Sequence, residues 1–187
     1  MSVLAVSTFL AILALVAFAI VTVTVIVALA DRWSLLPGEM RRMRATVGSS
    51  ALWLAASVAM IATAGSLYFS EVAGFIPCTL CWYQRIAMYP LALVLGIAAW
   101  RGEVGVRRYA APLAGIGALI SLYHIGVERL PGLPTGSCSL AVPCNLIWVE
   151  RLGFITIPVM ALAGFLLIIT LLLAFAGRGL EPLEASE

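Results

Sequence analysis

The chain of 187 residues is 63% hydrophobic, 11% of its residues are charged, and its mean hydropathy is +1.11. A soluble globular domain is far less apolar, so this composition predicts an integral membrane protein. The net charge of +2 comes from eleven arginines, no lysine and nine acids spread along the chain. This scatter excludes the concentrated basic surface of a nucleic-acid-binding protein. We expect membrane lipid, and no nucleic acid, among the partners.

Five apolar runs follow one another, each close to or above the ~18 residues that indicate a membrane-spanning helix. They cover residues 3–30, 49–70, 82–100, 109–127 and 154–176. We expect an all-α integral membrane protein with a four-helix transmembrane bundle core and one extra N-terminal transmembrane helix. The first run ends in a sequence that resembles a signal-peptidase site, but it has no basic leader and is longer than a signal-peptide core, so we expect it to be retained.

The arginines predict the orientation of the chain in the membrane. Eight lie between the first and second runs, between the third and fourth, or after the fifth, namely Arg32, Arg41, Arg42, Arg44, Arg101, Arg107, Arg108 and Arg178. These segments share one side of a five-helix chain, whereas the loops of the opposite side hold only Arg129 and Arg151. Because cytoplasmic loops carry an excess of positive residues, the arginine-rich side should be cytoplasmic. The N-terminus and all four cysteines should then be extracytoplasmic.

The four cysteines form two close pairs, which indicates redox or metal chemistry. Cys78 and Cys81 form a C-x-x-C at the start of the third run, and Cys138 and Cys144 form a C-x₅-C in a loop rich in proline and glycine. On the extracytoplasmic side, thiol–disulfide exchange could pass electrons from the loop pair to the helix-end pair. Two inert structural disulfides and a four-thiolate metal site are the alternatives. The oxidising compartment disfavours the latter, so we expect no metal.

The segment G-F-I-P-C-T-L-C-W-Y-Q-R suggests how the helix-end pair is activated. Pro77 is well placed to begin a helix, and unpaired amides at a helix N-terminus favour a thiolate. Cys78, Cys81 and Arg85 stand at i, i+3 and i+7, so they should share one helix face. Arg85 could stabilise negative charge there, or merely extend to the interface. His124, at a similar depth in the fourth run, could bond to an electron acceptor or play no special role.

These motifs together carry a family resemblance. C-T-L-C-W-Y-Q-R-I-A-M-Y-P-L, then Y-H-I-G-V-E, C-x₅-C-N and L-G-F-I-T-I-P resemble the disulfide bond formation protein B (DsbB) family, closest to its BdbC-like branch, over about residues 50–176. The resemblance implies a protein-disulfide:quinone oxidoreductase in the bacterial cytoplasmic (inner) membrane. Such an enzyme reoxidises a DsbA-like thioredoxin-fold thiol oxidase and passes the electrons to the membrane quinone pool, as ubiquinone or menaquinone.

The resemblance also implies roles for individual residues. Cys81 would lie beside the quinone and Cys78 would exchange with the loop, with Arg85 and His124 as quinone-binding residues. Cys138 would be the cysteine that exchanges with the partner, and Cys144 the resolving cysteine of the loop pair. Family members with widely spaced loop cysteines differ from the five-residue spacing found here.

The expected organisation is an extra helix with a basic cytoplasmic connection over residues 1–48, a redox domain over residues 49–177 and a short cytoplasmic tail over residues 178–187. Two other functions remain open. A vitamin K epoxide reductase-like quinone reductase also combines a four-helix bundle with loop cysteines, but there the loop pair is expected before the helix pair. A structural or partner-binding membrane protein would hold two inert disulfides.

Overall fold

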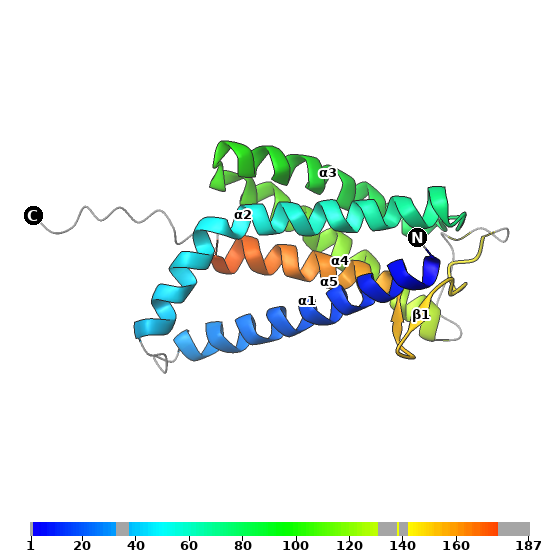
Figure 1. The fold of residues 1–187 in the computed structure, drawn as a ribbon, viewed down its shortest axis with the longest axis horizontal. Helices are drawn as coiled ribbons and strands as arrows, with labels where there is room; N and C mark the ends of the chain where they lie inside the picture. Colours follow the sequence, from blue (N-terminus) through cyan, green and yellow to red (C-terminus); the bar gives the residue numbers. More distant parts are fainter. Residues whose placement is uncertain (1, 33–37, 131–137, 139–141, 176–187) are drawn as a thin grey trace, which may run out of the picture.

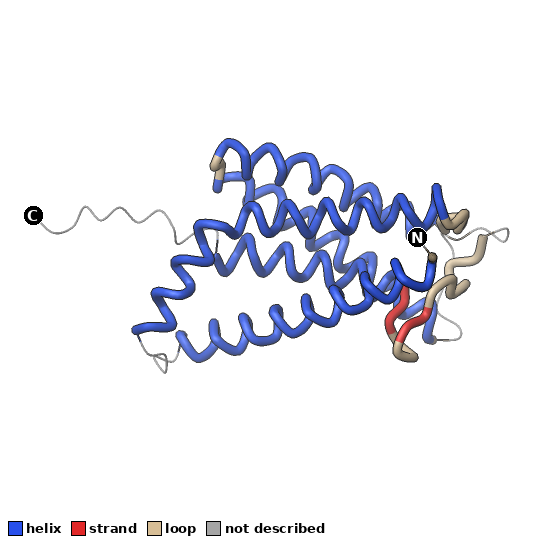
Figure 2. Tube along the Cα trace, viewed as in Figure 1, coloured by secondary structure: helices blue, strands red, loops and turns tan. Residues whose placement is uncertain are grey.

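The computed structural model describes residues 2–32, 38–130, 138 and 142–175 as a bundle of helices (Figure 1). The five α-helices are α1 (Val3–Arg32), α2 (Gly38–Leu67), α3 (Thr79–Arg101), α4 (Arg107–Arg129) and α5 (Ile157–Thr170). Three short helical turns adjoin them, namely η1 (Tyr68–Val72), η2 (Val104–Val106) and η3 (Leu171–Phe175). Two antiparallel strands of two residues each, β1 (Glu150–Arg151) and β2 (Ile155–Thr156), form a hairpin that is coloured red in Figure 2. The predicted all-α membrane fold is confirmed.

Four helical segments of the described chain are long and apolar enough to cross a membrane, namely Val3–Ala30, Ser50–Val72, Thr79–Arg101 and Val104–Arg129. The fifth apolar helix, Ile157–Leu173, is shorter. The second helix begins at Gly38, well before the predicted residue 49, because the intervening Glu, Met, Arg and Ala residues are strong helix formers. Much of the predicted connection is therefore helical. The tail and Arg178 lie outside the described residues, and the domain boundaries stay a prediction.

Small side chains hold the bundle together. α2 packs against α3, α4 packs against α3 and α5, and α1 lies along α5. Among the α2 side chains that the structure describes, the fully buried alanines are Ala51, Ala55, Ala56 and Ala59. Short side chains let neighbouring membrane helices approach closely, which increases van der Waals contact where no water drives association. Gly117 of α4 has the same effect, since a Cβ there would clash with the fully buried ring of Phe165 on α5.

The N-terminus, the hairpin and the start of α3 all lie at one end of the bundle (Figure 1). The turn η2, flanked by Arg101 and Arg107, lies at the other end. The predicted grouping of the N-terminus with the cysteines thus agrees with the fold. Which side of the membrane this end faces stays a prediction.

Candidate active site

A cysteine caps the N-terminus of α3. Cys78 is the N-cap residue, with an extended backbone, and its sulfur accepts a hydrogen bond from the Cys81 amide at 3.3 Å. Thr79 is the first helical residue, so the prediction that Pro77 begins the helix is wrong. Instead Cys78 caps the helix, because its sulfur accepts a hydrogen bond from an amide that the first helical turn leaves unpaired.

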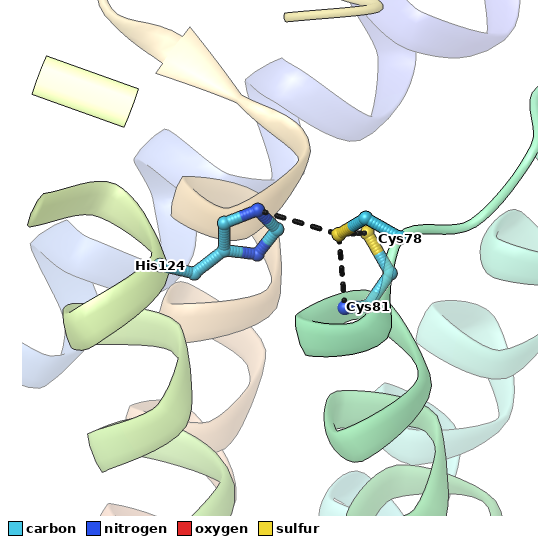
Figure 3. A group of neighbouring side chains, drawn as sticks. All are labelled: Cys78, Cys81 and His124. Atoms are coloured by element: carbon cyan, nitrogen blue, oxygen red, sulfur yellow. Dashed lines mark hydrogen bonds between the residues drawn. The ribbon is translucent and has the colours of Figure 1, made fainter. Parts of the chain in front are cut away.

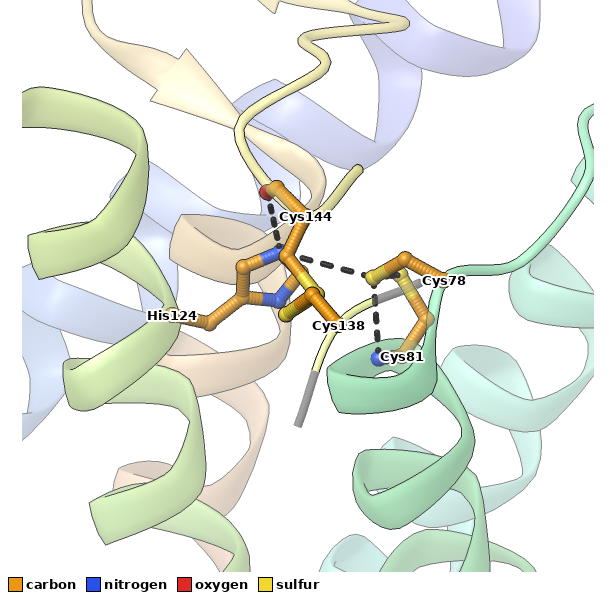
Figure 4. Close-up of a disulfide and its surroundings, with 5 residues drawn as sticks. All are labelled: Cys78, Cys81, His124, Cys138 and Cys144. Atoms are coloured by element: carbon orange, nitrogen blue, oxygen red, sulfur yellow. Dashed lines mark hydrogen bonds between the residues drawn. A yellow bond between two sulfur atoms is a disulfide. The ribbon is translucent and has the colours of Figure 1, made fainter. Parts of the chain in front are cut away.

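The structure brings all four cysteines into one apolar cluster at this end of the bundle (Figure 4). Cys138 and Cys144 form a disulfide, whereas Cys78 and Cys81 are free thiols whose sulfurs are 2.9 Å apart. Cys78 and Cys144 are both buried within the cluster. A loop disulfide therefore lies against a helix-end dithiol, which is the arrangement that thiol–disulfide exchange requires.

His124 of α4 faces Cys78 (Figure 3) and lies between the two cysteine pairs (Figure 4). Its Nε2 lies 3.0 Å from the carbonyl oxygen of Cys144 and 3.7 Å from Sγ of Cys78. A carbonyl oxygen only accepts hydrogen bonds, so Nε2 carries the hydrogen in this contact. The imidazole is 2% exposed, and within the described part of the chain its Nδ1 has no hydrogen-bond partner. His124 thus holds the backbone of the loop pair beside the sulfur of the helix pair.

The surroundings of Cys78 favour its thiolate. The hydrogen bond shared with the Cys81 thiol lowers the pKa of Cys78 most; burial opposes this, and the contacts with His124 and with the Cys81 amide lower the pKa further. An ionised sulfur can only accept, so Cys81 is the donor in that state. A stabilised thiolate makes the reduced form of a cysteine pair more stable and its disulfide a stronger oxidant.

Arg85 lies one helical turn beyond Cys81 and is 8% exposed. Its Nε donates to the Ser66 hydroxyl and its terminal NH₂ donates to the Ser66 carbonyl, both at 3.0 Å. Tyr89 also donates to the Ser66 hydroxyl, and the guanidinium lies 5.2 Å from the ring centre of Trp82. In the described residues no carboxylate pairs with Arg85. A buried cation without a paired anion in a membrane-spanning helix makes Arg85 a candidate residue of the functional site.

A cavity of about 250 Å³ opens beside Arg85. Its polar lining comes mainly from Cys81, Gln84, Arg85 and Tyr89 of α3, and the rest is largely apolar. Phe69, Phe75 and Trp148 line one part of it as a stack, with ring centres 5.8 and 5.0 Å apart. Neither Cys78 nor His124 is among its lining residues. The predicted shared helix face is therefore divided: Cys81 and Arg85 line the cavity, and Cys78 turns toward the loop.

The cluster also contains ligands of the kind that bind soft metals. The sulfurs of Cys78 and Cys81 and a ring nitrogen of His124 all lie within 4.8 Å of one another. The metal site considered from the sequence would use the sulfurs of all four cysteines. In the structure Cys138 and Cys144 form a disulfide, which leaves the thiols of Cys78 and Cys81 as sulfur ligands. The histidine is the added ligand, and its Nε2 hydrogen is engaged by the Cys144 carbonyl.

Comparison with known proteins gives this arrangement a family. The family model described as disulfide bond formation protein DsbB matches residues 48–142. The chain is similar to disulfide bond formation protein C of Bacillus subtilis, with 50% identity over 125 residues, which are 66% of this chain and 91% of that protein. The chain belongs to the DsbB family. It is also 47% identical to the probable disulfide formation protein C 1 of Bacillus cereus over 63% of this chain and 86% of that protein. No solved structure matches it.

Membership of the DsbB family makes the chain a disulfide-forming membrane oxidoreductase, and it confirms the BdbC-like resemblance. The family match begins at residue 48, so α1 lies outside it. Sequence reasoning missed Ser66, the anchor of Arg85, because a serine within an apolar helix carries no signal of its role. It also missed the contact between His124 and the Cys144 backbone, since any residue type supplies a carbonyl oxygen.

Proposed function

We propose that this DsbB-family protein reoxidises an extracytoplasmic, DsbA-like thiol oxidase and delivers the electrons to a membrane quinone. The observation that carries the proposal is the division of labour within one C-x-x-C motif. Cys78 lies against the loop disulfide through the His124 contact, while Cys81 lines the cavity that contains Arg85. The helix-end pair is thus in contact with the loop disulfide, the proposed source of the electrons, and with the cavity proposed to bind the quinone.

The proposed relay balances two electrons and two protons. The reduced partner attacks the Cys138–Cys144 disulfide through a mixed disulfide and leaves with its own disulfide formed. The loop pair, now a dithiol, then reduces a Cys78–Cys81 disulfide and regains its own. The pairing in the structure, with the loop pair bonded and the helix pair free, is the one that this second exchange would leave.

His124 is proposed to position the exchange between the pairs. Its imidazole N–H holds the Cys144 carbonyl and faces Sγ of Cys78, so it can stabilise the Cys78 thiolate that is released when the mixed disulfide between the two pairs is resolved. The contact with quinone that the resemblance implies for His124 stays a prediction.

The cavity suits an apolar molecule with a reducible oxygen-bearing ring. Arg85 has five N–H donors, of which Ser66 engages two, so the guanidinium retains donors for a ligand oxygen. Tyr89 and Gln84 add polar groups on the same helix, and apolar side chains make up most of the remaining lining. When bound, a quinone would accept the two electrons and two protons of the Cys78–Cys81 dithiol. Arg85 would stabilise the negative charge that arises on the ligand oxygen, and Cys81 would present its sulfur to the ring.

The bacterial cytoplasmic membrane, with the cysteine end outward, is the proposed location.

The decisive experiment gives the purified protein a reduced thioredoxin-like oxidase, with and without added ubiquinone or menaquinone, in the absence of oxygen. We expect the partner's disulfide to form catalytically only when quinone is present, with one quinol produced per disulfide. A protein with two inert disulfides would form no quinol, and that result would refute the proposed function.

A further inference from the structure

The N-terminal helix α1 has no place in the family match, yet it forms part of the cavity that contains Arg85. Its contributions are Leu10, Leu13, Ala14, Val16 and Ala17. Leu10, Leu13, Ala14 and Ala17 are spaced at i, i+3, i+4 and i+7, which places them on one helix face. The extra helix thus presents a continuous aliphatic surface to the site.

Specific contacts hold that surface in place. Near the start of α1 the hydroxyl of Ser7 is fully buried and accepts a hydrogen bond from Nε of Arg151 in the β1 strand at 2.9 Å. Farther along, Leu10 fits against Gly65 of α2, where a Cβ would lie 2.8 Å from the leucine Cδ1. Gly65 adjoins Ser66, the anchor of Arg85. The first turns of α1 are therefore fixed at the depth of the guanidinium.

α1 has one face toward the cavity and one toward the surroundings of the bundle. Its outer face carries apolar side chains that are more than half exposed, including Phe9 and Ile12. Along its inner face Ala14 and Ala17 are buried, and the helix packs along α5. In Figure 1 α1 and α2 lie on different sides of α5, and the cavity lining includes residues of all three helices. α1 thus lines one side of this cavity, with its opposite face toward the surroundings of the bundle.

The two sides of the cavity differ in chemistry. The α3 side supplies a thiol, an amide, a guanidinium and a phenol, whereas every α1 residue in the lining is aliphatic. A ligand with a polar, reducible ring and an apolar substituent would match both sides at once. The short side chains of the α1 alanines in the lining leave room for that substituent, and larger ones would remove it.

We propose that α1 is a wall of the quinone site and that Leu13, Ala14 and Ala17 determine which quinones fit. This inference rests on the proposed function, and it assigns a ligand-selecting role to a helix that lies outside the family match.

Photolabelling tests the contact directly. A quinone carrying a photoreactive azide on its ring or side chain is irradiated with the full-length protein, which is then digested with trypsin. The sequence has no lysine, and Arg32 is the first arginine, so α1 is released as one peptide of residues 1–32. We expect label in this peptide as well as in the peptide of residues 45–85, and excess unmodified quinone should abolish both. Competed label in 45–85 but none in 1–32 would overturn the inference.

A matched pair of substitutions tests the selection of quinones. Ala14→Phe fills the cavity, while Ala19→Phe places the same ring on the exposed face of the same helix. Overfilling a packed site typically costs enough to weaken binding about tenfold, so Ala14→Phe should raise the quinone KM by at least that factor and Ala19→Phe should not. The KM for the reduced protein partner should stay unchanged in both. Leu13→Ala, which removes volume without risk of a clash, should shift the relative KM values of short-tailed and long-tailed quinones.

The outcomes separate the two proposals. If the wild-type protein shows neither quinone-dependent turnover nor competed photolabel, the proposed function fails. If the wild type shows both, but Ala14→Phe and Leu13→Ala behave as Ala19→Phe does and the 1–32 peptide stays unlabelled, only the role of α1 fails.

Discussion

Arg85 offers the sharpest test of how the cavity works. The side chain is 8% exposed, its Nε and one terminal nitrogen are fixed by Ser66, and its remaining donors have no hydrogen-bond partner among the residues that the structure describes. Removing one donor that stabilises a developing oxyanion typically slows an enzyme by about 10²–10³-fold, or roughly 2.7–4 kcal/mol. We expect Arg85→Ala to lower kcat/KM for quinone by about 10²-fold, with both a higher quinone KM and slower turnover.

Two further variants separate charge from geometry. Arg85→Lys should recover part of the loss, because an ammonium keeps the charge but cannot bond both Ser66 groups and a ligand oxygen in one plane. Ser66→Ala should cause a smaller loss than Arg85→Ala, since the hydroxyl contact disappears while the backbone carbonyl still accepts from the guanidinium.

The assay is steady-state quinone reduction at varied quinone, normalised to folded protein. Arg101→Ala is the matched control, because Arg101 ends the same helix at the far end of the bundle and its side chain is 65% exposed. The control should leave the quinone KM unchanged. If Arg85→Ala also retained the wild-type KM and turnover per folded molecule, Arg85 would serve only insertion or anchoring, and the reasoning would be refuted.

Three other predictions concern the cysteines. An impermeant thiol reagent applied to intact cells after reduction should label Cys138 and Cys144; labelling only after the inner face is opened would reverse the orientation. Cys138→Ser should stop electron transfer from the protein partner yet leave transfer from a small dithiol through Cys78 and Cys81, so normal partner oxidation by this variant would break the relay. The hydroxyl of Cys81→Ser can still donate to the sulfur of Cys78. In this variant the rate of Cys78 alkylation should rise with pH around a midpoint below the ordinary thiol pKa of about 8.5, because a lowered pKa keeps the sulfur ionised at lower pH. Adding His124→Ala should move that midpoint to higher pH, and an unmoved midpoint would contradict the assigned contact.

The sequence was sufficient for the features that depend on local pattern. Runs of apolar residues predicted the helices. The spacing from Cys81 to Arg85 predicted that they share one helix face, and both line the cavity. The two cysteine pairs could be read from their motifs, although the helix begins at Thr79, after the capping residue Cys78, and not at Pro77. These inferences need only helix geometry and residue chemistry.

The remaining features depend on how distant segments meet. The contact of His124 with the Cys144 carbonyl requires the loop to fold back onto α4, and the hairpin consists of strands too short to show a period of two. Ser66 precedes Arg85 by 19 residues and becomes its anchor only when α2 and α3 pack. The aliphatic face of α1 is indistinguishable from a lipid-facing surface until the cavity beside it is known.

The central claim is that electrons entering from a protein partner collect on the Cys78–Cys81 pair. The most direct measurement mixes fully oxidised, quinone-depleted protein with one equivalent of reduced partner, quenches with acid, and maps the thiols by alkylation and mass spectrometry. Because the thiolate of Cys78 is stabilised, we predict thiols on Cys78 and Cys81 with the Cys138–Cys144 disulfide retained, as in the structure. Added quinone should then remove those thiols. Thiols that stay on Cys138 and Cys144, with the helix-end pair still oxidised, would contradict the relay.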